Sequence, residues 1–396
     1  MDIFNKCKFI VERVRLGHEM GIYSYFTPIS SVQDHRVRID GREFIMLGSN
    51  GYLGLAGDPR IKESAIKAIE KYGSTCSGSR FLNGTLDIHV KLEEDLAEFY
   101  EKDNAIIFST GFQTNLGIIS AIAGKNDIII IDRQDHASII DGCRLSFADV
   151  KKYRHNDMND LERILSSLPD NRGKIIIVDG VFSMEGDMSP LDQIVQLKKK
   201  YHTRLLVDDA HGVGVLGEKG QGTCEHFNVL KEVDIIMGTF SKAFASLGGF
   251  VVASADVITH IKHTARSLIF SASMTPAAVA SAQKALDIIK SEPERRKKLW
   301  AIAARILKGY KDIGLDAGES QTPVIPVIVG ADEMCFGFWK MLFANGIFTN
   351  PVIAPATPPG RALIRTSYMA THTEEDIQTV FDVFAKCARE IGLVEK

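Results

Sequence analysis

Lys242 directly follows a short apolar run and precedes a glycine-rich stretch, in the segment "IIMGTFSKAFASLGGF". Lysine is among the side chains that cost most to bury, so its place at the end of a predicted core strand needs a reason. One interpretation is an ordinary strand-end lysine whose ammonium group reaches water. The other is a reactive amine, and the residues after neighbouring predicted strands decide between them.

Those neighbouring segments carry a carboxylate, two imidazoles and a hydroxyl. Asp208 and His211 lie three residues apart after one apolar run, His136 follows another, and Ser183 follows a third. A metal site could use His136, Asp208 and His211, but it leaves Lys242 without a role. Pyridoxal 5'-phosphate (PLP) gives all of them a role, because it needs an amine for a Schiff base and a carboxylate that keeps its ring nitrogen protonated.

In the PLP interpretation, Lys242 supplies the amine and Asp208 supplies the carboxylate. The ring of His136 covers the pyridine face, and Ser183 and His211 hydrogen-bond the phenolic oxygen. Two of these assignments have plain alternatives, because His136 equally suits a helix cap and Ser183 equally suits a turn.

The cofactor phosphate requires hydrogen-bond donors at one end of the same site. Gly111 and Phe112 open a predicted helix, and backbone N–H groups at a helix start bind phosphate well. Thr239 and Ser241 add hydroxyl groups just before the lysine. No metal ion is part of this interpretation.

Short apolar runs alternate with amphipathic segments through the middle of the chain, which is typical of an α/β unit with a mostly parallel sheet. The predicted strands cover residues 105–108, 127–131, 174–178, 204–207, 234–237 and 249–253. The predicted helices between them cover residues 114–123, 160–168 and 191–201. Such sheets bind ligands at the carboxyl ends of their strands, where the residues named above should meet.

The flanking segments have a different character. A hairpin with its turn at Asp40-Gly41 precedes the sheet, and a helical pattern over 281–310, short strands and a final helix over 374–391 follow it. We therefore divide the chain into an N-terminal arm and hairpin (1–47), a large domain (48–280) and a smaller C-terminal α+β domain (281–396).

Bulk properties exclude several classes of protein. The 396 residues are 45% hydrophobic and 24% charged with a formal net charge of -3, which gives no electrostatic case for nucleic acid as a partner. No window approaches 18 apolar residues, so no transmembrane segment is expected. Six scattered cysteines without a C-x-x-C pair and a charged N-terminal segment without a signal-peptide pattern lead us to expect a reduced, cytoplasmic protein.

Other enzyme classes lack their usual motifs. The sequence contains no G-x-S-x-G nucleophile elbow, which disfavours a serine hydrolase. It has neither a P-loop nor a G-x-G-x-x-G after the first predicted strand. An oxidoreductase with a dinucleotide site is thus a weaker alternative.

Seven motifs together resemble, in order and spacing, the α-oxoamine synthases, a family of fold-type I PLP-dependent transferases. They are "GSNGYLGL", "SGSRFLNGT", "STGFQTNLG", "DHASIIDG", "DGVFSMEGD", "VDDAHGVGVLGEKGQG" and "GTFSKAFASLGGF". The resemblance extends from about residue 20 to about residue 390. It implies PLP as cofactor and a mostly parallel, seven-stranded sheet domain with a smaller C-terminal domain.

The resemblance also implies an activity, because this family condenses an amino acid with an acyl-CoA and releases CO2 and CoA. "SRFLNGTLDIH", "TFSKAFASLGGF", "FSASMTPA" and "LIRTSYMATHT" are most similar to the bacterial branch that joins L-serine to palmitoyl-CoA, giving 3-ketodihydrosphingosine for sphingolipid synthesis. Branches that use alanine or glycine, such as 8-amino-7-oxononanoate synthase and 2-amino-3-ketobutyrate CoA ligase, are the alternatives. Family subunits that lack the lysine are non-catalytic, and the lysine here argues against that role.

Residue roles carry over by motif. The resemblance implies a catalytic set of Lys242, His136, Asp208 and His211. It adds Ser271 of "FSAS" to the cofactor site, supplied by the other subunit of a homodimer with shared active sites. Asn50 and Arg365 resemble the residues that hold the substrate carboxylate, and Thr357 joins them as a candidate. Arg361 is left out because the position of this arginine varies among relatives.

Overall fold

The computed structural model describes residues 2–395, and its contacts divide the chain into two compact units. The large unit is Asn50–Leu299, and the small unit combines Met1–Ser49 with Trp300–Lys396. The domain boundaries that the sequence suggests, near residues 47 and 280, stay predictions. Within the described range, no helix is both long enough and apolar enough to cross a membrane.

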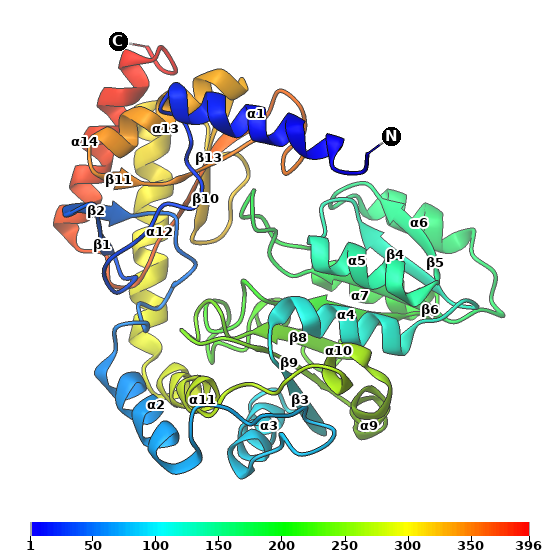
Figure 1. Ribbon diagram of the computed structural model, residues 1–396. Helices are drawn as coiled ribbons and strands as arrows, with labels where there is room; N and C mark the ends of the chain where they lie inside the picture. The colour runs from blue at the N-terminus through cyan, green and yellow to red at the C-terminus, as the bar shows by residue number, and fades with distance from the viewer. Residues whose placement is uncertain (1, 396) are drawn as a thin grey trace. The chain divides into compact units, whose positions relative to one another are not determined.

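A seven-stranded sheet forms the centre of the large unit, with the spatial order β3-β9-β8-β7-β6-β4-β5 (Figure 1). Its strands are β3 (Asn104–Phe108), β4 (Ile128–Asp132), β5 (Asp149–Tyr153), β6 (Lys174–Asp179), β7 (Arg204–Asp208), β8 (Ile235–Thr239) and β9 (Gly249–Ala253). Neighbouring strands from β8 to β5 pair in parallel. Strand β9 pairs antiparallel with both β3 and β8. The prediction of an α/β fold with a mostly parallel sheet is therefore confirmed.

Helices cover both faces of this sheet. The helices of the large unit include α2 (Pro59–Tyr72), α3 (Asp87–Phe99), α4 (Gly111–Ile122), α5 (Ala137–Ser146), α6 (Met158–Ser166), α7 (Leu191–Lys200), α8 (Thr223–His226), α9 (Ala255–Thr264), α10 (Arg266–Ile269) and α11 (Pro276–Ser291). Apolar side chains of α4, α5, α9 and α10 pack with alternate strand residues in one buried cluster. Helices α3, α6 and α7 contact strands without joining that cluster.

The composition of β4 shows why the chain forms strands here. Residues 128–131 are four consecutive isoleucines, each at most 1% exposed. β-branched side chains favour strands, and a run without polar alternation suits a strand covered on both faces. Each fully buried isoleucine stabilises the fold by roughly 1.5–3 kcal/mol.

Two elements differ from the sequence-based expectation. Strand β5, with the sequence "DVKKY", was not predicted, because Lys151 and Lys152 interrupt any apolar run. It lies at the edge of the sheet, where charged side chains discourage pairing with other chains. The single helical pattern over 281–310 is in fact two helices, α11 and α12 (Pro293–Ile313), because Pro293 lacks the N–H that would continue α11.

The small unit contains two three-stranded sheets, β1-β2-β11 and β10-β13-β12. Its elements are α1 (Asn5–Glu19), β1 (Arg36–Ile39), β2 (Arg42–Met46), β10 (Val324–Gly330), α13 (Asp332–Ala344), β11 (Ile347–Phe348), β12 (Asn350–Val352), β13 (Ala362–Ser367) and α14 (Glu374–Glu390). Strands β1 and β2 pair antiparallel, and Asp40 and Gly41 between them both have positive φ. The predicted hairpin is confirmed.

Candidate active site

A cavity of about 290 Å³ lies at the carboxyl ends of the central strands of the large unit. Nine of the ten predicted cofactor-binding residues line it, and the tenth, Ser271, does not. The nine are Gly111, Phe112, His136, Ser183, Asp208, His211, Thr239, Ser241 and Lys242. The sheet therefore brings residues from five separate loops to one place, as its topology predicts.

Lys242 lies on a short turn between β8 and β9. The N–H of Phe240 donates to the carbonyl of Gly248 at 3.0 Å, and the N–H of Ala245 donates to the carbonyl of Lys242 at 3.0 Å. These bonds close the turn on both sides of the lysine. Its side chain lines the same cavity as Asp208, so both groups serve one site.

Asp208 ends β7 and is 4% exposed. One carboxylate oxygen accepts the N–H of Ala210 at 3.0 Å, and the other accepts the side-chain amide of Asn115 at 2.6 Å. The same amide also donates to the hydroxyl of Ser138 at 2.8 Å. The carboxylate is therefore buried in a fixed orientation, in which it would favour a positive charge on a ligand in the cavity.

His136 lines the cavity and also caps α5, so its role as a helix cap is confirmed and does not exclude a role in the cavity. Its Nδ1 lies 2.7 Å from the hydroxyl of Ser138, and its backbone N–H donates to the carboxylate of Asp179 at 2.7 Å. Burial lowers the pKa of His136, outweighing the opposite effect of the Asp208 charge, and Lys242 adds to the lowering. The ring is therefore neutral at pH 7 and presents an uncharged face.

The opposite end of the cavity has the features of a phosphate site. Thr110 caps α4 by accepting the N–H of Gln113 at 3.1 Å, and the hydroxyls of Thr239 and Ser241 lie 2.9 Å apart. A Cβ atom on Gly111 would lie only 2.8 Å from the hydroxyl of Thr239. Glycine thus keeps the first turn of α4 open beside two hydroxyl donors, and these residues fit a phosphate group.

Sequence reasoning missed Tyr52, whose hydroxyl lies 2.7 Å from Nδ1 of His211. The same hydroxyl lies 3.4 Å from the side-chain oxygen of Asn50, so Asn50 is two contacts away from His211. Tyr52 is 1% exposed and stands in "GSNGYLGL". That motif was the available signal, but nothing in it distinguishes a tyrosine that orients His211 from one that fills the core.

The remaining predicted residues lie outside this cavity. Ser271 accepts a hydrogen bond from the side-chain amide of Gln113 at 3.2 Å. Arg365 lies on β13 of the small unit, is 5% exposed, and has a guanidinium nitrogen 3.4 Å from the hydroxyl of Ser367. Thr357 is also buried, in the loop between β12 and β13. The structure thus gives each an ordered place without uniting them with the nine.

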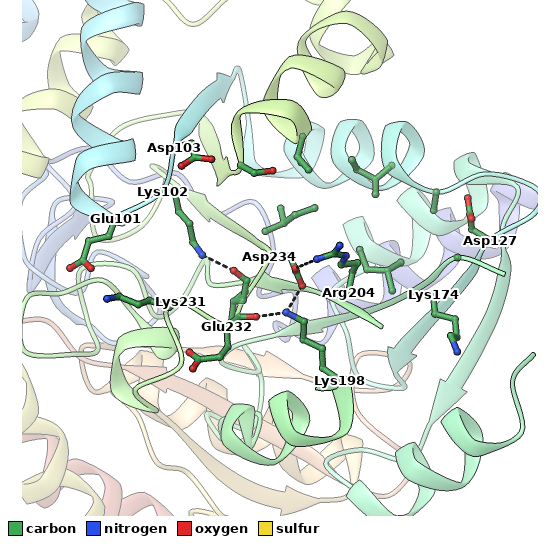
Figure 2. A pocket seen from close by; sticks show the side chains of 18 residues that line it. Glu101, Lys102, Asp103, Asp127, Lys174, Lys198, Arg204, Lys231, Glu232 and Asp234 are labelled. Atoms are coloured by element: carbon green, nitrogen blue, oxygen red, sulfur yellow. Dashed lines mark hydrogen bonds and ion pairs between the residues drawn. The ribbon is translucent and has the colours of Figure 1, made fainter. Parts of the chain in front are cut away.

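A larger cavity, of about 590 Å³, lies at the opposite, amino-terminal ends of β6, β7 and β8. Figure 2 shows the side chains of Lys198 and Arg204 directed at the carboxylate of Asp234. The carboxylate of Asp234 forms ion pairs with Lys198, at 2.6 Å, and with Arg204, at 2.9 Å. Lys102 donates to the backbone carbonyl of Val233 at 2.7 Å. Asp234 thus serves two cations and Lys102 is held by a backbone carbonyl, so the charged groups of this cavity are engaged in structural contacts.

The metal alternative has no geometric support. Within residues 2–395, no three histidine, cysteine, aspartate or glutamate side chains are arranged so that they could hold a metal ion. His136, Asp208 and His211 are therefore not grouped as metal ligands in the described part of the chain.

Known proteins similar to this chain agree with the cavity. The family model of class I and II aminotransferases matches residues 42–384. A serine palmitoyltransferase from Sphingobacterium spiritivorum is 51% identical over 381 residues, covering 96% of this chain and 95% of that protein. An 8-amino-7-oxononanoate synthase from Thermoanaerobacter pseudethanolicus is 42% identical over the whole of both chains. A solved serine palmitoyltransferase from S. paucimobilis with a bound PLP-myriocin aldimine is 35% identical, with a TM-score of 0.96 and full coverage of both chains.

Proposed function

The chain belongs to the class I and II aminotransferase family and, within it, to the α-oxoamine synthases, and from that membership we propose that it acts as a serine palmitoyltransferase. This activity is a PLP-dependent acyl transfer that condenses L-serine with palmitoyl-CoA to 3-ketodihydrosphingosine, CO2 and CoA. One observation carries the proposal. A single cavity is lined by Lys242, Asp208 and His136, in a chain that is 51% identical to a serine palmitoyltransferase.

Lys242 and Asp208 have distinct tasks in the cavity. Bound PLP supplies an aldehyde for an amine and a protonated ring that takes up the electron pair left at the amino-acid α-carbon. Lys242 would hold the cofactor through its amine, and the same amine would take the α-proton of serine and return a proton at the end. Asp208, fixed by Asn115 and Ala210, keeps the proton on the ring nitrogen.

Three further side chains orient the cofactor ring. The neutral imidazole of His136 covers one ring face, and its buried ring needs no counter-ion there. Ser183 and His211 bind the phenolic oxygen. Tyr52 contacts Nδ1 of His211, which leaves Nε2 to face the cofactor oxygen. The hydroxyls of Thr239 and Ser241, with the open start of α4 at Gly111 and Phe112, hold the phosphate.

The residues proposed for substrate binding are assigned by their motifs. Arg365 and Asn50 hold the carboxylate of serine, assisted by Thr357. A guanidinium group suits this task because its fork donates two parallel hydrogen bonds to a carboxylate. The α-carbon then forms a bond to the palmitoyl carbonyl carbon, CoA leaves as its thiolate, and the serine carboxylate leaves as CO2.

We propose that the chain works as a cytoplasmic homodimer with shared active sites. In this arrangement Ser271 of one copy completes the phosphate site of the other. Ser271 is not among the residues that line the cavity of its own chain, and this supports the proposal. Size-exclusion chromatography coupled to light scattering tests the stoichiometry.

The function itself is tested by measuring CoA release from the PLP-loaded chain. L-serine, L-alanine and glycine are each combined with palmitoyl-CoA, a pimeloyl thioester and acetyl-CoA. We expect release with L-serine and palmitoyl-CoA, well above every other pair. Release only with L-alanine and the pimeloyl thioester would replace this proposal with the 8-amino-7-oxononanoate synthase activity.

A further inference from the structure

His155 lies in the loop between β5 and α6, and both of its ring nitrogens contact a carboxylate. Nδ1 lies 3.1 Å from an oxygen of Asp132, and Nε2 lies 2.8 Å from an oxygen of Asp187. An imidazole donates through both nitrogens only when it is protonated. The geometry therefore specifies a cation held between two anions, with a side chain only 23% exposed.

The two carboxylates belong to two different loops of the cofactor cavity. Asp132 ends β4, four residues before His136, and Asp187 lies in the loop after β6 that carries Ser183. Asn156 strengthens the connection, because its backbone N–H donates to Asp132 at 2.9 Å and its side-chain amide donates to Asp187 at 2.9 Å. The loop after β5 thus ties together the loops after β4 and β6.

From Asp132 a continuous set of hydrogen bonds leads to His136. The N–H of Asp132 donates to one oxygen of Asp135 at 2.9 Å, and the other oxygen of Asp135 accepts the N–H of Asp179 at 2.9 Å. The carboxylate of Asp179 in turn accepts the N–H of His136 at 2.7 Å. A displacement of Asp132 would therefore be transmitted through these hydrogen bonds to the backbone of His136.

From Asp187 the connection to Ser183 is shorter. The N–H of Phe182 donates to the carbonyl of Asp187 at 3.0 Å, and the N–H of Gly186 donates to the carbonyl of Phe182 at 2.9 Å. The ring of Phe182 also meets the ring of His155 edge-on, with centroids 4.4 Å apart. His155 thus packs directly against the residue that precedes Ser183.

We propose that His155 is a positioning residue for the acyl transfer: it joins the loop after β4 to the loop after β6 and so sets the ring of His136 and the hydroxyl of Ser183 for the cofactor. The proposal rests on the proposed function, which gives those two side chains a common ligand. His155 is not among the residues that line the cavity, and it acts through Asp132 and Asp187.

The charges around His155 explain why a cation is needed there. Asp132 and Asp187 face it directly, and Asp135 links the backbone of Asp132 to that of Asp179. Burial raises the pKa of Asp135 well above its ordinary value, and the Asp179 charge adds to this; burial and the Asp208 charge do the same to Asp179. A cation beside this group of acids offsets their mutual repulsion. When His155 loses its proton at high pH, only one ring nitrogen can still donate, and one of the two hydrogen bonds to Asp132 and Asp187 is lost.

The test compares His155→Gln and His155→Ala with His202→Gln, a control at an exposed histidine in the turn after α7. The first readout is the dissociation constant of PLP, measured by visible absorbance between about pH 6 and pH 10. We expect the wild-type constant to rise as the pH passes about 9. His155→Gln should bind PLP roughly tenfold more weakly at neutral pH, as loss of a charged hydrogen bond implies, and should lack that pH-dependent step.

A second readout separates positioning from general destabilisation. Saturated with PLP, His155→Gln should show a lower kcat with a nearly unchanged KM for L-serine. Hydrogen exchange without PLP should speed up in the peptides that contain His136 and Ser183, while β7 and β8 stay protected. If His155→Ala folds poorly, both readouts can still be obtained from His155→Gln, because its side-chain amide keeps one hydrogen-bond donor group at this position.

The outcomes keep the two proposals apart. Wild-type PLP affinity in His155→Gln at every pH, with unchanged exchange at both loops, would overturn the role of His155. A wild-type chain that binds no PLP would instead refute the proposed function, and hydrogen exchange would still decide whether His155 holds the two loops.

Discussion

Replacing His155 with glutamine should remove a pH-dependent part of the stability of the chain, independently of any cofactor. Burial lowers the pKa of His155, but its hydrogen bonds to Asp132 and Asp187 outweigh burial and raise the pKa from 6.5 to about 9. A histidine whose pKa is raised by folding stabilises the folded state fully below its unfolded pKa, and the contribution is lost as the pH rises through about 9. A difference of about 2.5 pH units at about 1.4 kcal/mol each gives about 3–4 kcal/mol.

The assay is urea denaturation of the PLP-free wild type and His155→Gln, followed by circular dichroism near pH 6 and near pH 10. Titrations elsewhere, such as that of Asp209, whose pKa burial raises to about 7, largely cancel when the two proteins are compared at one pH. The wild type should be more stable by about 3–4 kcal/mol near pH 6 and by close to zero near pH 10. An equal difference at both pH values would refute the charged bridge.

Two further substitutions test other parts of the structure, each with a matched control. Gly111→Ala should weaken PLP binding roughly tenfold with little change in Tm, because its Cβ would lie 2.8 Å from the hydroxyl of Thr239. The control, Gly124→Ala, should bind PLP normally, because its Cβ has its nearest neighbour at 3.8 Å. Equal PLP affinities of the two variants would contradict the proposed phosphate site at the start of α4. Arg80→Met should lower the free energy of unfolding by about 3–5 kcal/mol in urea denaturation, because it leaves Glu93 buried without its ion-pair partner. The control, Arg144→Met, removes an exposed ion pair and should lower it by less than about 1 kcal/mol. Similar losses in the two variants would contradict the importance of burial.

Much of the large unit follows from local sequence. Six of the seven strands were predicted from apolar runs, because a strand covered on both faces leaves little room for polar alternation. Strand β5 was not predicted because Lys151 and Lys152 make its sequence polar. These lysines reflect the position of β5 at the edge of the sheet and do not indicate a local preference against strand structure. Only the pairing of β5 with β4 reveals it.

The site was predictable to the extent that topology determines it. Residues that follow parallel strands converge on one edge, so Asp208 and Lys242 could be read as neighbours before any coordinates. Asn115 and His155 could not be found in this way. Asn115 looks like an ordinary polar position of an amphipathic helix, and only the tertiary placement of α4 over the sheet aims its amide at Asp208. His155 follows the strand that sequence reasoning missed, so its place beside the loops after β4 and β6 was hidden as well.

The most direct test of the proposed function is to locate the lysine that binds PLP. The PLP-loaded chain is reduced with borohydride, digested, and mapped by mass spectrometry, and Lys242→Ala is treated in the same way. We predict that the reduced cofactor is found on the peptide that contains Lys242, and that Lys242→Ala shows neither covalent cofactor nor CoA release. Cofactor on a different lysine, or turnover by Lys242→Ala, would contradict the account.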